Sequence, residues 1–276
     1  MSIAIKDPLA KMLDLQIVSA EENSLTTSAD CMTDVTNRYG IAHGGYLHTL
    51  AHLTSVLAAE QFLGGSWEAD YASCQFLRAL RQFPAKTTAT LVTAKGCAPL
   101  LRSEVYDAKG MLCFTQLMGL RPAAPALQQP KTHTPKILHA NPMPADLDVE
   151  PPFPCMSTSF SRLLNCYSIR KQGTGLVYAL DLIEKNCDAN GFVHPAAVFT
   201  LADAAAGGSL VRIEKKSPIT VSAFIRFLEH GEDGMVEAIP RLTRGGRALY
   251  FYDVDIIDGA GRPVAAGQFV IQNLDA

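Results

Sequence analysis

The sequence repeats itself at a constant offset of 151 residues. Residues 40–59 ("GIAHGGYLHTLAHLTSVLAA") and residues 191–210 ("GFVHPAAVFTLADAAAGGSL") align without a gap. The same offset relates Phe76 to Phe227 and Gly110 to Gly261, so it persists over about seventy residues. This pattern indicates two copies of one domain, because a solenoid needs more and shorter repeats.

A proline-rich stretch separates the two copies. Nine of the sixteen prolines fall between residues 122 and 154, in a stretch with neither helix nor strand periodicity. We therefore predict an N-terminal domain over residues 1–121, a linker over 122–152 and a C-terminal domain over 153–276. A length of 276 residues suits two domains of this size.

Each copy is predicted to contain one buried helix followed by strands. Residues 47–58 and 198–210 are apolar almost all round a helix, which is typical of burial. Residues 218–230 alternate as a strand does, and residues 234–272 read as three more strands. The glycine turns "DAKG" and "DGAG" predict hairpins. This order predicts an α+β fold with an antiparallel sheet.

Composition excludes several classes of protein. A net charge of −3 gives no support for nucleic-acid binding. The chain has no apolar run of about eighteen residues to span a membrane, and its first residues lack the apolar core of a secretion signal. Its seven cysteines are scattered, which favours buried thiols in a reducing compartment. We expect a cytoplasmic protein without a cofactor.

Two short motifs resemble the hotdog-fold acyl-CoA thioesterases. The pattern N-x-x-G-x-x-H-G-G at residues 37–45 looks like the loop that enters the helix in those enzymes. Asp203, nine residues after His194, stands where they carry a catalytic carboxylate. "FLRAL" at 76–80 resembles their "FLRP" strand, with Ala79 replacing proline. Two such units on one chain resemble the double-hotdog members of that family.

The resemblance implies a fold, an activity and a substrate. The fold would be two tandem hotdog domains, each an antiparallel sheet wrapped around a long central helix. The activity would be hydrolysis of an acyl-CoA thioester to a free acid and CoA, within fatty acid metabolism. Hotdog units associate in pairs, so the resemblance also allows a homodimer of double-hotdog chains.

The two glycines after His43 are candidates for binding the thioester carbonyl. A helix start carries unpaired backbone N–H groups and the positive end of the helix dipole. Glycine lets a carbonyl oxygen approach the backbone closely. We therefore predict that Gly44 and Gly45 form an oxyanion hole. The alternative is that they only make the tight turn into the helix.

Asp203 is the candidate catalytic carboxylate. It lies within the apolar segment "FTLADAAAGG". A carboxylate in such surroundings must be paired, be protonated through a raised pKa, or be used in chemistry. It could act as a general base on water or attack the carbonyl itself. The alternative is an Asp without a role.

The two copies have lost opposite halves of this chemistry. The first copy keeps Gly44 and Gly45 but has His52 where the carboxylate should be. The second keeps Asp203 but has Pro195, which lacks an N–H, where the first glycine should be. In hotdog dimers the helix start of one unit faces the carboxylate of the other. We therefore expect one composite active site per chain and an inactive mirror site between Pro195 and His52.

The remaining candidates follow from the resemblance or from charge. Thr220 stands where related enzymes carry a Ser or Thr that orients the carboxylate or the water, although it could simply be a strand former. Gln268 resembles a glutamine on the last strand of the double-hotdog enzymes. Asn37 and His43 could bind the thioester carbonyl or brace the loop.

Arginines near the end of the chain are candidates for binding CoA phosphates. Arg244 and Arg247 flank a Gly-Gly turn in "RLTRGGR", and a CoA ester needs basic side chains nearby. The alternative is a solvated hairpin turn.

Three other interpretations of the sequence compete with that of a thioesterase. His48 and His52 have the spacing of a zinc pair, but no Glu follows His48, so we predict no metal site. "DANGFVH" differs from the D-x-N-P-x-H motif of hotdog enoyl-CoA hydratases, since Asp188 and His194 are six residues apart. A non-catalytic acyl-CoA-binding hotdog protein is the third alternative, because each copy has lost half of its motif.

Overall fold

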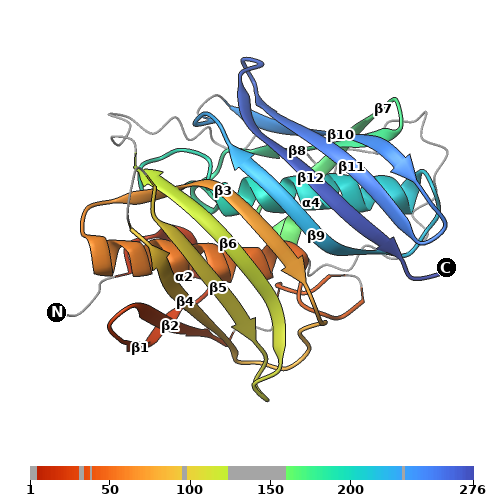
Figure 1. The fold of residues 1–276 in the computed structure, drawn as a ribbon. Coiled ribbons are helices and arrows are strands. Elements are labelled where there is room, and N and C mark those ends of the chain that lie inside the picture. The colour runs from red at the N-terminus through yellow and green to blue at the C-terminus, as the bar shows by residue number, and fades with distance from the viewer. Residues whose placement is uncertain (1–4, 31–33, 38, 95–97, 124–159, 232–233) are drawn as a thin grey trace.

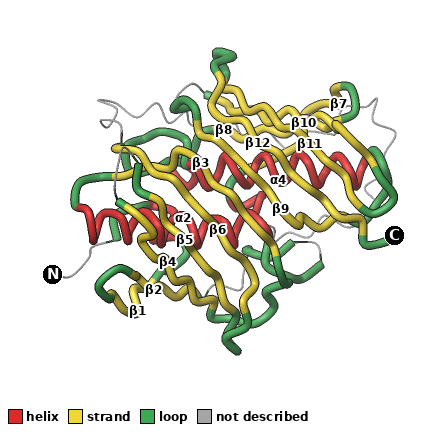
Figure 2. The backbone as a smooth tube through the Cα atoms, viewed as in Figure 1, coloured by secondary structure: helices red, strands yellow, loops and turns green. Residues whose placement is uncertain are grey.

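The computed structural model describes residues 5–30, 34–37, 39–94, 98–123, 160–231 and 234–276, and the predicted linker from residue 124 to 152 lies outside them. The described chain forms one twelve-stranded antiparallel sheet with two long helices on one face (Figures 1 and 2). We call residues 5–123 the first half and residues 160–276 the second half.

Each half contributes six strands and one long helix. The elements of the first half are α1 (Pro8–Met12), β1 (Gln16–Ala20), β2 (Ser24–Ala29), α2 (Gly44–Leu63), β3 (Trp67–Phe76), β4 (Ala85–Thr93), β5 (Leu100–Tyr106) and β6 (Leu112–Pro122). Those of the second half are α3 (Phe160–Leu163), β7 (Cys166–Gln172), β8 (Gly175–Asp181), η1 (Glu184–Asn186), α4 (Pro195–Arg212), β9 (Pro218–Phe227), β10 (Met235–Gly245), β11 (Leu249–Asp258) and β12 (Pro263–Asn273). The buried helices and the four strands predicted for the second copy are confirmed.

The two half-sheets join edge to edge. The strand order is β1-β2-β4-β5-β6-β3-β9-β12-β11-β10-β8-β7. At the junction β3 pairs with β9, from Tyr71 opposite Arg226 to Gln75 opposite Ser222. Helix α2 contacts β2 to β6, helix α4 contacts β7 to β12, and the two helices also pack against each other. A helix between a sheet and a second helix is covered on most sides, which explains why both are apolar nearly all round.

The repeat in the sequence is also a repeat in the structure. Helices α2 and α4 begin at residues 44 and 195, and β3 and β9 span residues 67–76 and 218–227, each 151 residues apart. The predicted hairpin turns have the same design. Asp107 accepts hydrogen bonds from two backbone N–H groups of its turn, and so does Asp258. Gly110 and Gly261 both have positive φ, at +77° and +79°.

The described residues contain free cysteines but no metal cluster and no membrane-spanning helix. The four cysteines that the structure describes are buried free thiols: Cys74, Cys113, Cys166 and Cys187. In the described part of the chain, no group of three or more His, Cys, Asp or Glu side chains could hold a metal ion. Among the helices in these same ranges, none is long and apolar enough to cross a membrane.

Candidate active site

The start of α2 in the first half lies against Asp203 of α4 in the second half. A Cβ atom at Gly44 would be 2.9 Å from Oδ2 of Asp203 and 3.1 Å from Cε1 of Phe76. No side chain fits there without displacing one of these groups. The Nδ1 atom of His43 lies 3.8 Å from the same carboxylate oxygen. Gly44 and Asp203, 159 positions apart in the sequence, are therefore neighbours.

Asp203 is a buried carboxylate with one side chain hydrogen bond. It is 7% exposed, and Oγ1 of Thr220 donates a hydrogen bond to its Oδ1 atom at 2.6 Å. No described residue donates a hydrogen bond to Oδ2, the oxygen beside Gly44. Burial raises the pKa of Asp203 above 3.8, although His43 and the Thr220 hydrogen bond act in the opposite direction. Oδ2 is thus an oxygen that can exchange a proton with a reacting group.

The two glycines at the start of α2 differ in their hydrogen bonds and in their neighbours. His43 caps the helix, and its Nδ1 atom accepts a hydrogen bond from the Gly45 N–H at 2.9 Å. No described residue accepts a hydrogen bond from the Gly44 N–H. A Cβ atom at Gly45 would collide with the side chain of Thr200 on α4. Gly44 is therefore the one candidate oxyanion donor of the pair, whereas Gly45 allows the two helices to approach closely.

His43 is part of the loop structure. Its Nδ1 atom accepts the Gly45 N–H, so this atom carries no proton to share with Asp203 across the 3.8 Å. Burial lowers the pKa of His43, and the nearby Asp203 only partly opposes this. Asn37 accepts a hydrogen bond from the backbone N–H of Tyr39 through Oδ1. Of the two readings made from the sequence, these contacts favour bracing of the loop.

Gln268 lies away from Asp203, which corrects its place in the predicted site. It is exposed on β12, and its Nε2 atom donates a hydrogen bond to Oδ1 of Asp253 at 3.2 Å. The next residue, Phe269, is buried and packs against Phe199 of α4. Successive side chains of a strand point to opposite faces. An alignment shift of one residue therefore moves the side chain to the outer face of the sheet.

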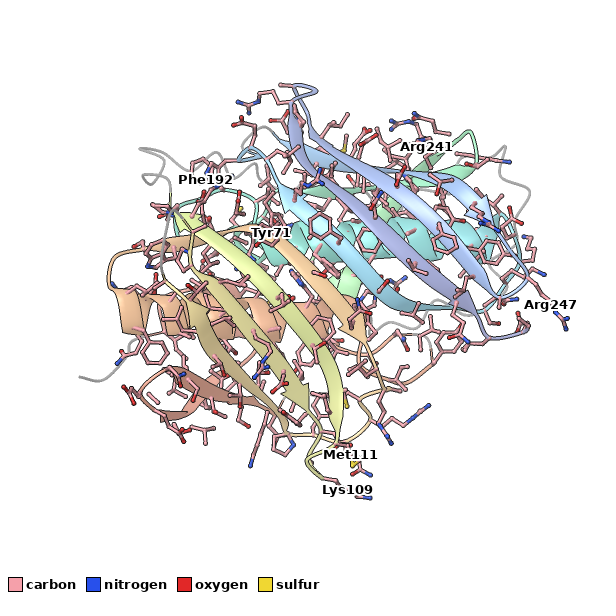
Figure 3. All side chains as sticks on the ribbon, in the orientation of Figure 1. Tyr71, Lys109, Met111, Phe192, Arg241 and Arg247 are labelled. Atoms are coloured by element: carbon pink, nitrogen blue, oxygen red, sulfur yellow. The ribbon has the colours of Figure 1, made fainter. Side chains whose placement is uncertain are left out.

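Arg244 and Arg247 lie at the hairpin between β10 and β11. Both are exposed, and no described residue forms an ion pair with either; Figure 3 shows Arg247 at the outer edge of the molecule. Across the sheet, Thr220 is opposite Ile271, which is two strands from Gly245. At the usual strand spacing, three steps correspond to about 14 Å. The hairpin is thus at the same end of the sheet as Thr220, but not in contact with it.

Three further side chains near the site were not predicted from the sequence. Phe76 contacts the position of Gly44, Thr200 contacts that of Gly45, and the ring of Phe160 lies 6.3 Å from that of His43. Thr200 and Phe76 are identical to their counterparts in the other copy, and this identity is the sequence signal that could have identified them. Phe160 follows the residues that the structure leaves undescribed, and no motif marks it.

The mirror position differs from this arrangement. His52 is 151 residues before Asp203, and its ring centroid lies 5.1 Å from that of His194. His194 caps α4 as His43 caps α2, because its Nδ1 atom accepts the Ala196 N–H at 3.0 Å. Its Nε2 atom is 3.2 Å from Oδ2 of Asp7, a residue from the start of the chain. As expected, the first half has His52 and not a carboxylate at the position that corresponds to Asp203. A carboxylate is nevertheless close, because Asp7 lies beside His194.

One family model matches part of the second half of the chain. Residues 190–265 match the family model described as the thioesterase superfamily, a span that contains α4, Asp203 and Thr220. This match agrees with the resemblance to thioesterases and with the prediction of a thioester hydrolase, at the level of the superfamily.

Solved structures share the fold over nearly the whole chain. An acyl-CoA thioesterase II from Mycobacterium marinum has a TM-score of 0.61 and 13% identity, with 96% of this chain and 97% of that chain covered. A tesB protein of Mycobacterium avium subsp. paratuberculosis has a TM-score of 0.60 and 12% identity, with 96% and 99% covered. A conserved protein of unknown function with a hot dog fold, from Alicyclobacillus acidocaldarius, has a TM-score of 0.63 and 13% identity, with 92% and 94% covered. None of the curated protein sequences compared with this chain matches it.

Proposed function

We propose that this chain is an acyl-CoA thioesterase built from two tandem hotdog domains, with one composite active site between them. The observation that carries the proposal is the contact between Gly44 of the first half and the buried Asp203 of the second. Neither half contains both groups. The family match supports a thioester substrate, and the Mycobacterium marinum neighbour, described as an acyl-CoA thioesterase II, supports an acyl-CoA.

The proposed reaction uses the Gly44 N–H as the oxyanion donor. The thioester carbonyl oxygen accepts a hydrogen bond from this group, at the positive end of α2. As the tetrahedral intermediate forms, negative charge develops on that oxygen and strengthens the hydrogen bond. The capping of α2 by His43 holds the Gly44 backbone in position.

Asp203 acts as the general base in this proposal. It takes a proton from water, and the water oxygen forms a bond to the carbonyl carbon. The C–S bond then breaks, and the protonated Asp203 returns the proton to the departing thiolate of CoA. A carboxyl whose pKa is raised by burial is suited to both steps. Thr220 binds Oδ1, which leaves Oδ2 to contact the water.

The test is hydrolysis of a panel of short, medium, long and aromatic acyl-CoAs, with released CoA as the readout. Asp203→Asn should lower kcat by about 10²–10⁴-fold, the usual contribution of a general base. Asp255→Asn is the matched control, since Asp255 is exposed on β11. Because the chain contains seven cysteines, a thiol reagent needs a protein blank. Equal activity of the wild type and Asp203→Asn would contradict the proposal.

An isotope experiment separates a general base from a nucleophile. In H₂¹⁸O under single-turnover conditions, a general base leaves Asp203 unlabelled, and the ¹⁸O appears in the product acid. A nucleophilic Asp203 would form an anhydride, and its hydrolysis could transfer ¹⁸O to the side chain. Mass spectrometry of the peptide containing Asp203 is the measurement. Label in Asp203 would overturn the general-base role.

The other readings gain no support from the site. The residues of the hydratase alternative are engaged elsewhere, because Asp188 accepts two backbone N–H groups and His194 caps α4. A non-catalytic binder would show saturable binding of CoA esters without turnover in the same panel. The domain boundaries, the pairing of two chains, the phosphate-binding arginines and the cytoplasmic location stay predictions.

A further inference from the structure

The loop that follows β3 adjoins the candidate active site. We call residues 77–82 the entrance loop. Phe76, the last residue of β3, contacts the position of Gly44. The Ala42 N–H donates a hydrogen bond to the Leu80 carbonyl oxygen at 3.0 Å, which holds the entrance loop beside the segment that leads into α2. The entrance loop is therefore connected to the site both through β3 and through the start of α2.

The entrance loop carries two arginines at the surface. Arg78 and Arg81 are exposed, and no described residue forms an ion pair with either. Leu77 is also 56% exposed, so the chain reaches the surface directly after the site. Because two residues of extended chain span at most about 7 Å, the Cα atom of Arg78 lies within about 7 Å of that of Phe76. Two long basic side chains are thus available close to the site.

The corresponding loop of the second half has the opposite charge. We call residues 228–233 the mirror loop. At the offset of 151 residues, Arg78 matches Glu229 and Arg81 matches Glu232. The entrance loop contains no Asp or Glu, whereas the mirror loop contains no Lys or Arg. Glu229 is exposed, as Arg78 is, and Glu232 lies outside the described residues. The two copies have therefore exchanged basic for acidic residues at this point.

The backbones of the two loops are held in the same way. The Val193 N–H donates a hydrogen bond to the Gly231 carbonyl oxygen at 3.0 Å, which repeats the bond between Ala42 and Leu80. Strands β3 and β9, which lead into the loops, end at corresponding positions. The difference in charge is therefore not a consequence of a different backbone. It accompanies the difference in chemistry, because the arginines lie on the side of Gly44.

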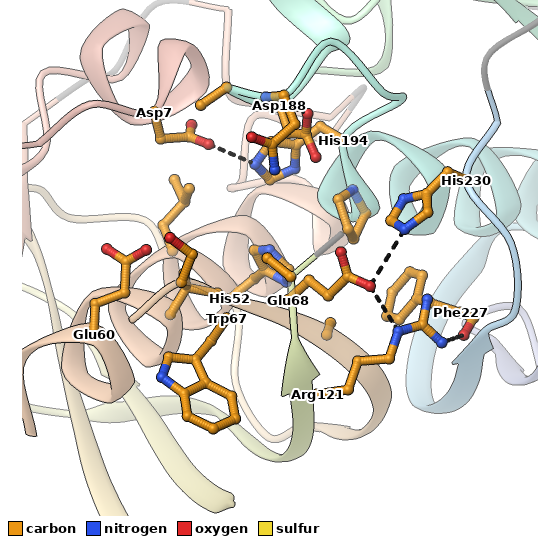
Figure 4. Close-up of a pocket in the computed structure, with 18 of the residues that line it drawn as sticks. Asp7, His52, Glu60, Trp67, Glu68, Arg121, Asp188, His194, Phe227 and His230 are labelled. Atoms are coloured by element: carbon orange, nitrogen blue, oxygen red, sulfur yellow. Dashed lines mark hydrogen bonds and ion pairs between the residues drawn. The ribbon is translucent and has the colours of Figure 1, made fainter. Parts of the chain in front are cut away.

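The described part of the mirror loop is engaged by its own neighbours. The Nε2 atom of His230 lies 3.3 Å from Oε1 of Glu68 (Figure 4). Arg121 pairs with the same carboxylate oxygen at 2.7 Å and donates a hydrogen bond to the Phe227 carbonyl oxygen at 3.1 Å. Each of these two basic groups thus already has a carboxylate partner. Among its described residues, the mirror loop offers no unpaired cation to a phosphate.

Other charged side chains around the entrance loop do not cancel the two arginines. The turn between β5 and β6 packs against the loop, because the Ala108 N–H donates a hydrogen bond to the Gln82 carbonyl oxygen at 3.2 Å. This turn carries Lys109, which Figure 3 shows at its tip, and Asp107, which accepts two backbone N–H groups of its own turn. With Asp34, in the segment before α2, three basic side chains accompany two acidic ones.

A CoA thioester needs positive charge at the entrance of its site. Its acyl carbonyl would lie at Gly44 and Asp203, and the pantetheine arm carries the diphosphate and the 3′-phosphate away from that carbonyl. Arginine suits phosphate because its guanidinium donates two parallel hydrogen bonds. The hairpin with Arg244 and Arg247 is not in contact with the site. Because CoA has phosphates at two places, the two basic sites do not exclude each other.

We propose that Arg78 and Arg81 bind the phosphates of the CoA thioester at the entrance of the composite active site. This inference rests on the proposed function, because it names the part of the site that holds the nucleotide. The charge of each loop then follows the chemistry beside it. Arginines accompany the end of the molecule with the Gly44 N–H, and glutamates accompany the end with Pro195.

The test compares two thioesters with the same acyl group. One is the acyl-CoA that the wild type hydrolyses fastest, and the other is its N-acetylcysteamine thioester, which has no phosphate. In the double variant Arg78→Glu with Arg81→Glu, the ratio of kcat/KM for the acyl-CoA to kcat/KM for the N-acetylcysteamine thioester should fall about tenfold at low salt, mainly through KM. High salt should reduce this change, because it screens exposed charges. An equal fall for both thioesters, which leaves the ratio unchanged, would overturn the proposal.

Two further variants separate the position of the charge from its loss. Arg78→Lys with Arg81→Lys keeps the charge and should recover part of the ratio. Arg102→Glu is the matched control, because Arg102 is exposed on β5, and its ratio should equal that of the wild type. A fall in Arg102→Glu as large as in the double glutamate variant would show that any lost positive charge suffices, and would also overturn the proposal.

Binding of free CoA separates this inference from the proposed function. Isothermal titration needs no hydrolysis, and the wild type should bind CoA about tenfold more tightly than the double glutamate variant. If the wild type hydrolyses no thioester but this difference in affinity is found, the proposed function fails and the phosphate site stands. If thioesters are hydrolysed and both proteins bind CoA equally, the phosphate site is refuted and the proposed function stands.

Discussion

Replacing Thr220 by valine removes the hydrogen bond to Asp203 at nearly constant side-chain volume. The Thr220 hydroxyl donates to Oδ1 at 2.6 Å, and this bond stabilises the ionised carboxylate. It therefore lowers the pKa of Asp203, against the larger effect of burial. Without the hydroxyl, the pKa of Asp203 should rise further. Because the proposed general base must be ionised, activity at low pH should fall most.

The size of the effect follows from the strength of the bond. A hydrogen bond to a charged group contributes about 1.5–3 kcal/mol, and one pKa unit corresponds to about 1.36 kcal/mol. The acidic limb of kcat/KM should therefore move to higher pH by about 1–2 units. Below that limb the loss should be about 10–100-fold, whereas well above it most of the activity should return.

The measurement is kcat/KM against pH for the wild type, Thr220→Val and Thr220→Ser. Serine keeps a hydroxyl and should restore the wild-type limb, whereas valine should not. The same shift must appear with two acyl-CoA substrates if it belongs to the enzyme. A uniform loss across the pH range, with the limb unmoved, would refute the tuning argument and leave Thr220 with a purely geometric role.

Three further predictions follow from contacts of the site. Burial raises the pKa of folded Asp203, so its ionisation destabilises the native state as pH rises above 3.8; Asp203→Asn should raise Tm at pH 7 more than at pH 4, and equal shifts would contradict this. Gly45→Ala should destabilise the protein by about 1–3 kcal/mol through its collision with Thr200, as measured by urea unfolding, and Thr200→Ala in the same chain should recover part of the loss. Arg244→Glu combined with Arg247→Glu should raise KM for acyl-CoA at low salt with little change in kcat, and an unchanged KM would leave the hairpin without a phosphate role.

Most of the architecture could be predicted because it depends on local patterns. Apolar runs of helical length predicted α2 and α4, and strict alternation predicted β9. Aspartate-glycine turns predicted the hairpins, because an Asp side chain can bond its own turn and glycine tolerates positive φ. Because the two copies align at an offset of 151 residues, an element predicted in one half also predicts the corresponding element of the other half. The pairing of β3 with β9, which joins the halves into one sheet, carries no such local signal.

The sequence alone determined which chemical groups the chain has and which it has lost, since Gly44, Asp203, Pro195 and His52 are readable from an alignment of the two copies. Only the tertiary structure decided which of those groups are available. Whether an N–H is already bonded, and which face a strand residue occupies, depends on partners distant in the chain. The Gly45 N–H is bound by His43, and Gln268 faces outward. Around His52, Asp7 meets His194 across 187 residues, because burial and packing bring together groups that no sequence spacing relates.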